Sequence, residues 1–251
     1  MKFIEDLRDK PEYVDEECFI IGSGLSLDDY PGSPGTDDDW FLNKFTIAVN
    51  YSFLGIFEPT FIASIHAPPI VYIKKKLPHL LSRCIAFCPV DRTHSSNGMA
   101  YNQIGDYGES VIYAETSISG QSKENFQKTA NAIMAKQPAL FRARGSITHL
   151  AIQAAVVLGA KKITLIGCEE KAGRFRYHAT RGGISKFALE PLDYHPPLKG
   201  LKEYPKEWQE GTIKGPPKHR EGQVYLAEIY KPLGIEIKKY FYGTSYEDPI
   251  L

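Results

Sequence analysis

The chain has 251 residues, of which 43% are hydrophobic and 24% charged, enough for one large α/β domain or for a domain with an inserted lobe. Its 30 basic and 30 acidic residues balance, which disfavours a global attraction to nucleic acid or anionic membranes. The N-terminal stretch MKFIEDLRDKPEYVDEE is charged where a signal peptide would be apolar, and no apolar run approaches the roughly 20 residues that span a bilayer. We therefore expect a cytoplasmic protein without a membrane span.

The four cysteines lie in or beside apolar, strand-like runs, at Cys18, Cys84, Cys88 and Cys168. This placement favours buried, reduced thiols over a disulfide scaffold. Cys84 and Cys88 lack a second pair at zinc spacing, so the sequence predicts no metal site there.

The stretch Cys18–Leu27, CFIIGSGLSL, predicts a buried strand followed by a glycine turn. Gly22 and Gly24 remove Cβ atoms where the backbone bends sharply or approaches a ligand. The following turn, with Ser23 and Ser26, can aim N–H groups at an anion such as a nucleotide phosphate. A tight turn between two elements is the alternative interpretation of a single Gly-x-Gly.

Two further strands are expected at Phe45–Val49 and Thr60–Ser64. The first ends in Asn50, where a dinucleotide-binding fold would have an acidic residue for the ribose, so the pattern does not favour NAD. The amide of Asn50 can still bond a ribose or a base. The second leads into Ile65–Pro69, predicted as a loop in which His66 reaches a ligand.

The rest of the chain continues as strands and helices up to a long irregular segment. Strands are expected at Arg83–Phe87 and Ser110–Ala114, and a packing helix over Ser122–Lys136 that Pro138 ends.

Asp28–Asp39 is rich in Pro, Gly and Asp and is predicted to be a solvated loop; metal binding by its carboxylates is the alternative.

The clearest unit is Gly145–Glu170, GSITHLAIQAAVVLGAKKITLIGCEE. Apolar residues from Ile147 to Leu158 recur at helical spacing, with Ser146 as N-cap and Gly159 as terminator. A buried strand, Lys162–Ile166, follows and ends at Gly167. The helix N-terminus would present N–H groups to the ligand crevice. His149 either faces a ligand or packs.

Gly173–Gly222 shows weak periodicity and is predicted to be a lid or small lobe, or disordered. Cations and aromatic groups suited to an anionic ligand occur there: Arg174, Arg176, Tyr177, His178 and Arg181. A helix at Gln223–Pro232, with His219 just before it, and a strand at Ile235–Tyr242 end the chain.

These elements predict an α/β fold with a Rossmann-like, mostly parallel sheet, helices on both faces and a C-terminal lid or small lobe. We expect residues 1–172 and 218–251 to form a nucleotide-binding domain and residues 173–217 to be the inserted lid. The sequence leaves homo-oligomerisation open.

The chain resembles bacterial sialyltransferases of glycosyltransferase family 42 and the related 6-hydroxymethylpterin pyrophosphokinase-like domain family. Three blocks carry the resemblance: IIGSGLSL at Ile20–Leu27, AVNYSF at Ala48–Phe53 and SITHLAIQAAVVLGAKKITLIGCEE at Ser146–Glu170. His219 followed by a helix and a strand is a fourth, weaker block.

The resemblance implies an inverting transferase that takes a nucleotide-sugar donor and a sugar or small-molecule acceptor without a metal cofactor. It makes His219 the general base. Of the two tyrosines that support the leaving phosphate in the family, one position holds Lys171 here, and Tyr177 lies further on. The residues that it places around the nucleotide, together with those at the predicted sheet edge, are Gly22, Ser23, Gly24, Ser26, Asn50, His66, Ser146, Ile147, Thr148, Gly167 and Glu169. Ser23 and Glu169 stand where the family commonly has asparagine and aspartate.

Two other functions remain open from the sequence. A pyrophosphokinase would transfer diphosphate from ATP to a pterin-like alcohol and would need Mg²⁺, which Glu169, Glu170 or Asp37–Asp39 could hold. A non-catalytic nucleotide-binding protein could keep the same fold, because fold does not imply chemistry.

Overall fold

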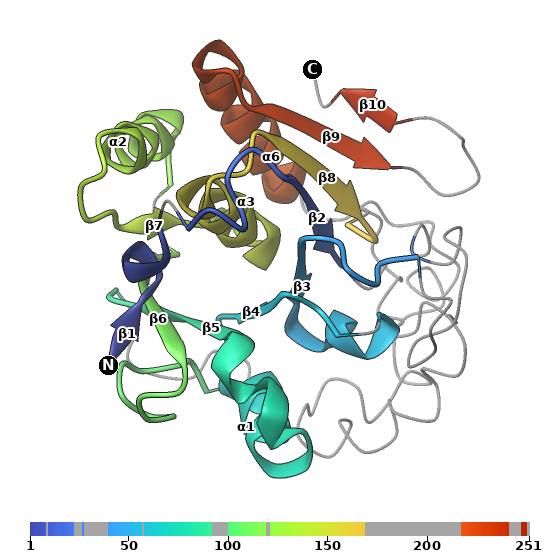
Figure 1. Ribbon diagram of the computed structural model, residues 1–251. Helices are drawn as coiled ribbons and strands as arrows, with labels where there is room; N and C mark the ends of the chain where they lie inside the picture. The colour runs from blue at the N-terminus through green and yellow to red at the C-terminus, as the bar shows by residue number, and fades with distance from the viewer. Residues whose placement is uncertain are drawn as a thin grey trace, which may run out of the picture.

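The protein is described by a computed structural model that covers residues 1–8, 10–22, 27, 40–56, 58–91, 100–118, 121–168, 217–240 and 247–249. Within these residues one sheet contains ten strands (Figure 1). The strands are β1 Lys2–Phe3, β2 Glu17–Ile21, β3 Thr46–Val49, β4 Phe61–Ser64, β5 Cys84–Pro89, β6 Ile112–Ser117, β7 Phe141–Arg142, β8 Lys162–Ile166, β9 Glu236–Tyr240 and β10 Glu247–Pro249.

The strand order is β1-β6-β5-β4-β3-β2-β8-β9-β10, with β7 also paired to β6. Among the described strand pairs, β9 and β10 run antiparallel and the others run parallel. The chain moves outward from β2 to β6 and then returns to the other side of β2 at β8. This reversal places a topological switch point beside β2, where the carboxyl ends of open parallel sheets bind ligands.

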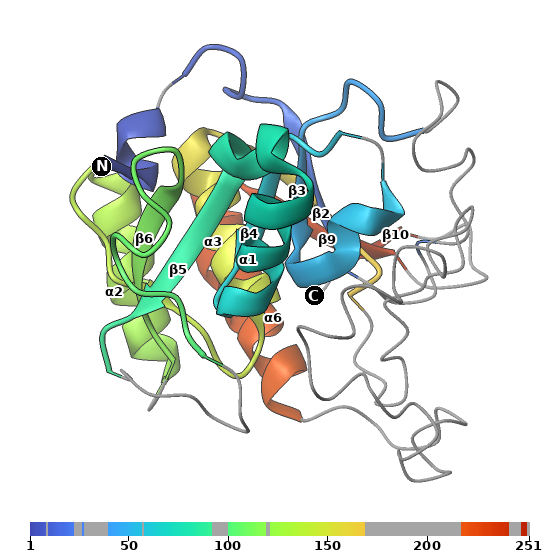
Figure 2. The same ribbon diagram turned by 90° about the horizontal axis from the view of Figure 1, so that it is seen from below.

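Helices cover both faces of the sheet. The α-helices are α1 Ala67–Lys76, α2 Lys123–Met134, α3 Ile147–Leu158 and α6 Pro217–Tyr230, and the 3-10 helices are η1 Ile4–Leu7, η3 Asn50–Gly55, η4 Pro78–Arg83 and η9 Lys231–Leu233. In Figure 2, α1 lies on one side of the sheet and α3 and α6 lie on the other. One apolar cluster joins the sheet to α2, α3 and α6, and a second joins the opposite face to α1. The predicted Rossmann-like α/β class is confirmed.

The crossover from β7 through α3 to β8 follows the sequence pattern closely. Ser146 Oγ accepts the N–H of Thr148 at 3.2 Å and so caps α3, while Gly159 ends the helix at φ +106°. All the residues of α3 after Ile147 are buried, since the helix packs among sheet and helices. The predicted bounds of α3 and β8 are both confirmed.

Several elements differ from the prediction. Ile65–Pro69 was expected to be a loop, but α1 begins at Ala67, because prolines in the first helical turn lose no intrahelical hydrogen bond. The last helix was expected to begin at Gln223 and begins at Pro217, so His219 lies inside its first turn rather than before it. The short strands β1, β7 and β10 were not predicted.

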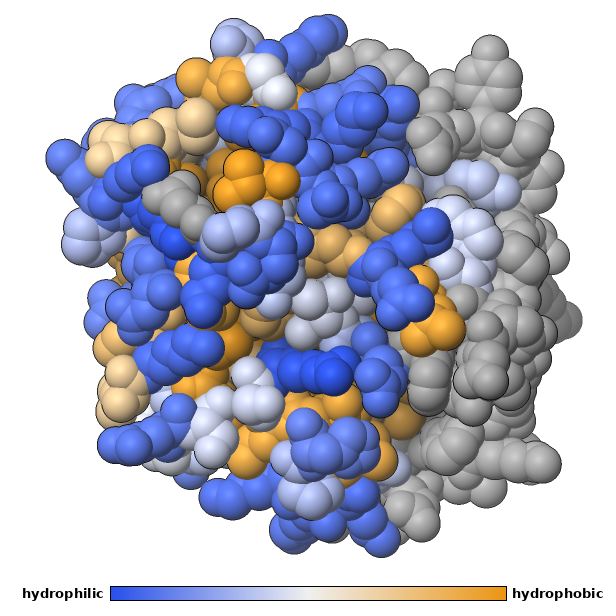
Figure 3. Space-filling model, in the orientation of Figure 1, coloured by the Kyte–Doolittle hydropathy of each residue, from blue (hydrophilic) through white to orange (hydrophobic). Residues whose placement is uncertain are grey.

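All four cysteines are buried and none forms a disulfide, as the sequence predicted. In the described part of the chain, none of the helices combines the length and apolar content that crossing a bilayer would take. The face shown in Figure 3 interleaves hydrophilic residues with small apolar patches. Residues 28–39 and most of 173–217, including the predicted lid, lie outside the described residues.

Candidate functional site

A cavity of about 420 Å³ opens at the carboxyl edge of the sheet. Its walls come from the ends of β3, β4, β6 and β7 and from the first turns of α3 and α6. The lining residues are Asn50, Ile65, His66, Tyr101, Ile118, Ala143, Gly145, Ser146, Ile147 and His219. The volume lies within the range of about 300–1,000 Å³ that is common for small-molecule sites.

Asn50 enters this cavity from the end of β3 in a left-handed backbone conformation, with φ +54°. Ser64 Oγ, at the end of β4, lies 3.0 Å from Asn50 Oδ1 and 2.9 Å from the His66 carbonyl oxygen, the two acceptors that its single hydroxyl proton can reach. Nδ2 is the side-chain group with which Asn50 can donate to a ligand.

A buried polar network holds the backbone of Ser64 in place. Asn102 Nδ2 donates to the Ser64 carbonyl at 2.7 Å, and the Tyr107 hydroxyl donates to Asn102 Oδ1 at 2.8 Å. Burial raises the pKa of Tyr107, so its hydroxyl stays protonated and able to donate. The cavity wall at Asn50 is therefore rigidly supported.

His66 and Tyr101 form an aromatic wall. His66 precedes α1 as its N-cap residue and pairs with Tyr101 in an antiparallel bridge. The two rings stack with centroids 5.4 Å apart and an interplanar angle of 27°. Flat rings of this kind suit a nucleobase or the apolar face of a sugar.

The N-terminus of α3 forms another part of the wall. Ser146 and Ile147 line the cavity, so the partial positive charge of the helix end lies beside it. Thr148 does not line the cavity; its hydroxyl lies 3.9 Å from Cys168 Sγ, beyond the end of β8. Thr148 therefore packs α3 against the sheet, although the resemblance placed it at the nucleotide.

Gln153 fixes the segment that leads into α3. Its side chain is fully buried and bonds both backbone groups of Arg142, accepting from N–H at 3.1 Å and donating to the carbonyl at 2.7 Å. The amide thus completes the hydrogen bonding of β7 as a neighbouring strand would. This contact positions Ala143 and Gly145 at the cavity.

Gly22 and Gly167 meet at the switch point. The Gly22 N–H donates to the Ile166 carbonyl at 2.7 Å, and a Cβ built on Gly22 would lie 2.2 Å from the Gly167 carbonyl oxygen. The described contact of Gly22 is thus with the end of β8. The predicted site residues Ser23, Gly24, Ser26, Glu169, Lys171 and Tyr177 lie outside the described residues.

His219 reaches the cavity from the first turn of α6. Gly145 has φ +79°, and a Cβ built on it would lie 3.1 Å from His219 Nε2. The imidazole therefore lies against Gly145, at the residue before the N-cap of α3. The structure brings His219 together with four other predicted residues, namely Asn50, His66, Ser146 and Ile147.

His149 is a packing residue, the second of the two roles that the sequence left open. It is fully buried, accepts the Arg144 N–H at Nδ1 (3.1 Å) and donates Nε2–H to the His219 carbonyl (2.8 Å). Burial lowers the pKa of His149 to about 4, so the ring is neutral at physiological pH.

Sequence reasoning missed part of the cavity wall: Ile65, Tyr101, Ile118, Ala143 and Gly145. Tyr101 lies in a stretch without periodicity, so no pattern marks it. Ile118 and Ala143 follow β6 and β7, and recognising β7 would have placed Ala143 at the same edge.

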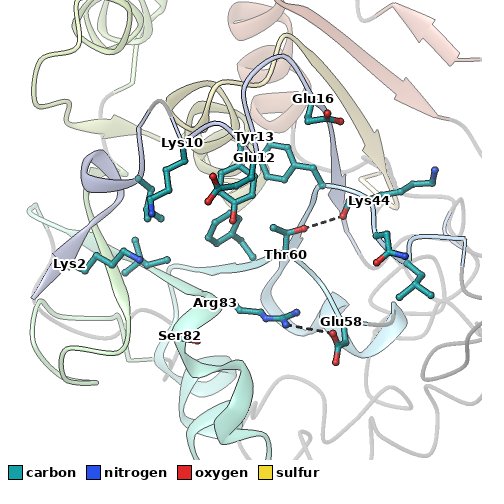
Figure 4. Close-up of a pocket in the computed structure, with 16 residues that line it drawn as sticks. Lys2, Lys10, Glu12, Tyr13, Glu16, Lys44, Glu58, Thr60, Ser82 and Arg83 are labelled. Atoms are coloured by element: carbon teal, nitrogen blue, oxygen red, sulfur yellow. Dashed lines mark hydrogen bonds and ion pairs between the residues drawn. The ribbon is translucent and has the colours of Figure 1, made fainter.

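A second cavity, of about 660 Å³, lies at the amino ends of β3, β4 and β5 (Figure 4). Charged side chains of both signs surround it, among them Lys2, Lys10, Glu12 and an Arg83–Glu58 pair at 3.6 Å. It is larger but lies opposite the edge at which the switch point opens. We therefore take the carboxyl-edge cavity as the candidate site.

The topology and this cavity define a Rossmann-like α/β protein with a candidate ligand site at the carboxyl edge of its sheet. Comparison of the chain with protein-family models, curated proteins and solved structures found no match.

Proposed function

We propose that the protein is a glycosyltransferase-like enzyme that binds a nucleotide-activated sugar in the carboxyl-edge cavity and transfers the sugar, with inversion, to an acceptor hydroxyl. One observation carries the proposal: an imidazole, His219, meets Asn50 and the capped N-terminus of α3 at a single cavity. These three features supply a base, a hydrogen-bond donor and an anion-binding helix end.

The cavity offers different chemistry to each part of such a donor. The N-terminus of α3 favours the phosphates, because its N–H groups and partial charge attract anions. Asn50 Nδ2 can donate to a ribose or base oxygen, and the stacked rings of His66 and Tyr101 offer a surface to a flat group. Ser146 can donate its hydroxyl proton, since its oxygen already accepts from Thr148.

In the proposed step His219 accepts the proton of the acceptor hydroxyl as the hydroxyl oxygen attacks the anomeric carbon. The bond from that carbon to the phosphate oxygen breaks, and the nucleotide leaves with the electron pair. A single displacement of this kind inverts the anomeric centre. An imidazole suits the task at neutral pH because its unperturbed pKa is about 6.5. By resemblance, Lys171 and Tyr177 would support the departing phosphate.

The test is release of nucleotide from a panel of CMP-, UDP- and GDP-sugars by the purified chain, with and without EDTA. We expect turnover of at least one donor, retained in EDTA, and a loss of about 100-fold or more in His219→Ala with donor binding retained. His79→Ala is the matched control, because His79 is an exposed histidine on η4, a 3-10 helix that does not line this cavity.

Three outcomes would overturn the proposal. Full activity of His219→Ala removes the base. Transfer from ATP to a pterin-like alcohol that requires Mg²⁺ and stops in EDTA would identify diphosphate transfer instead. Absence of any thermal shift with nucleotides or nucleotide sugars at saturating concentration would identify a protein without this ligand class.

A further inference from the structure

We propose that His149 and Glu221 are positioning residues for His219, acting through a closed ring of interactions with Arg144. The inference rests on the proposed function, in which His219 is the base. Neither residue lines the cavity; both act by holding the first turn of α6 in place.

The ring can be followed atom by atom. The Arg144 N–H donates to His149 Nδ1 at 3.1 Å, and His149 Nε2–H donates to the His219 carbonyl at 2.8 Å. Glu221 lies two residues after His219 in α6. Its Oε2 accepts from Arg144 Nε at 3.0 Å and from Arg144 Nη2 at 2.8 Å. The ring closes on Arg144, so the backbone before α3 and the first turn of α6 are tied at two points.

Arg144 and Glu221 are also held by contacts outside the ring. Arg144 Nη1 donates to the Gln121 carbonyl at 2.5 Å, and its guanidinium lies 5.8 Å from the centre of the Tyr225 ring. The Tyr225 hydroxyl donates to Glu221 Oε1. Both carboxylate oxygens of Glu221 therefore accept hydrogen bonds, which fixes the orientation of the carboxylate.

Two glycines allow the close fit. A Cβ on Gly222 would lie 2.5 Å from His149 Cε1, and a Cβ on Gly145 would lie 3.1 Å from His219 Nε2. A side chain at position 222 would push α6 away from α3, and one at position 145 would crowd the His219 imidazole. The ring and the two glycines together hold the imidazole of His219 beside the helix N-terminus.

Such precision matters because a shift of about 1 Å in a reacting group can cost about 100-fold in rate. Two hydrogen bonds from the Arg144 guanidinium to Glu221 Oε2, and one from Tyr225 to Oε1, set the direction of the pair as well as its distance. A neutral imidazole that accepts at one nitrogen and donates at the other bridges two backbone groups.

The chain offers a matched control for Glu221. Glu228 lies on the same helix and pairs with Lys123 of α2 at 2.5 Å, so it too ties α6 to the rest of the fold. It is nine residues beyond His219, about 13 Å along the helix. Glu221→Gln and Glu228→Gln each remove one charge from one ion pair that ties α6 to the rest of the fold, but only the first touches the ring.

We expect kcat for the accepted donor to fall about 10- to 100-fold in Glu221→Gln, with KM within about twofold of wild type and the pH profile altered. Glu228→Gln should keep kcat within about twofold, although both variants lower the unfolding midpoint. His149→Phe keeps a flat aromatic ring, somewhat larger than imidazole, but loses both bonds, and it should follow Glu221→Gln.

An NMR measurement separates this inference from the proposed function. The imidazole signals of His219, assigned with His219→Gln, should shift or broaden in Glu221→Gln and stay unchanged in Glu228→Gln. If no donor is turned over, the proposed function fails. The His219 signals still show whether Glu221 positions the His219 ring. Identical His219 signals in the two glutamine variants, or equal kcat where turnover exists, would overturn the inference.

Discussion

Gly22 and Gly167 approach so closely at the switch point that a Cβ on Gly22 would lie 2.2 Å from the Gly167 carbonyl oxygen. The two residues directly follow β2 and β8, strands that pair in parallel from Glu17 and Lys162 onward. The clash partner is backbone, so it cannot move aside as a flexible side chain would.

Gly22→Ala should therefore destabilise the protein by about 1–3 kcal/mol, the usual cost of overpacking, and should separate the ends of these strands. Urea unfolding followed by circular dichroism measures the change. An unaltered unfolding midpoint would contradict the contact.

Asn50 allows its backbone and its side chain to be tested separately. Its φ of +54° is strained for alanine but not for glycine. Asn50→Ala should be about 1 kcal/mol less stable than Asn50→Gly, whereas both should lose the affinity of the cavity for nucleotide because both lack the amide. Urea unfolding and calorimetric titration of the two variants provide the comparison. Wild-type affinity in Asn50→Gly would show that the amide does not touch the ligand.

His149 makes stability depend on pH. Burial lowers its pKa to about 4 from an ordinary value of 6.5, so between these values the unfolded chain takes up a proton that the folded protein excludes. The contribution of His149 to the free energy of unfolding is complete above pH 6.5. It falls as the pH drops, and the loss reaches about 3 kcal/mol near pH 4.

Urea unfolding between pH 4 and pH 7 tests this dependence. His149→Phe should lose this part of the slope, whereas the exposed control His79→Phe should keep it. A further check needs no variant: the wild-type His149 ring should remain neutral at pH 5 in ¹⁵N spectra. A charged ring at pH 5 would contradict the account.

The cysteines should be unreactive in the folded protein. All four are buried, and burial raises the pKa values of Cys84 and Cys88 to about 12, so few thiolates form at neutral pH. A thiol reagent such as 5,5′-dithiobis(2-nitrobenzoic acid) should react slowly with native protein and with four thiols in urea. Rapid reaction of any thiol in the native state would refute this.

Patterns that report burial on both faces predicted much of the fold. The runs at Cys18–Ile21 and 163–166 are strands buried on both sides, so the sheet and its parallel character followed from sequence. The helical spacing, cap and terminating glycine of α3 were equally readable.

The sequence was less informative about features that depend on position within an element or on tertiary contacts. α1 was missed because its prolines lie in the first turn, the one part of a helix that tolerates them. β7 has two residues, too few for a period, and the side chain of Gln153 supports it. The contact of Gly22 with Gly167 joins segments 145 positions apart in sequence, which no local pattern reports.

The measurement that tests the central claim most directly is calorimetric titration of CMP, CDP, UDP, GDP and ATP into wild type and into Ile147→Trp. Ile147 is partly buried and lines the cavity, so an indole there would fill it. The control is Leu233→Trp, because Leu233 is an exposed apolar residue in η9. We predict that at least one nucleotide binds wild type and Leu233→Trp alike, with one site per chain, and at least tenfold more weakly to Ile147→Trp. Binding of none of them, or equal binding to all three proteins, would contradict a nucleotide site at the carboxyl edge.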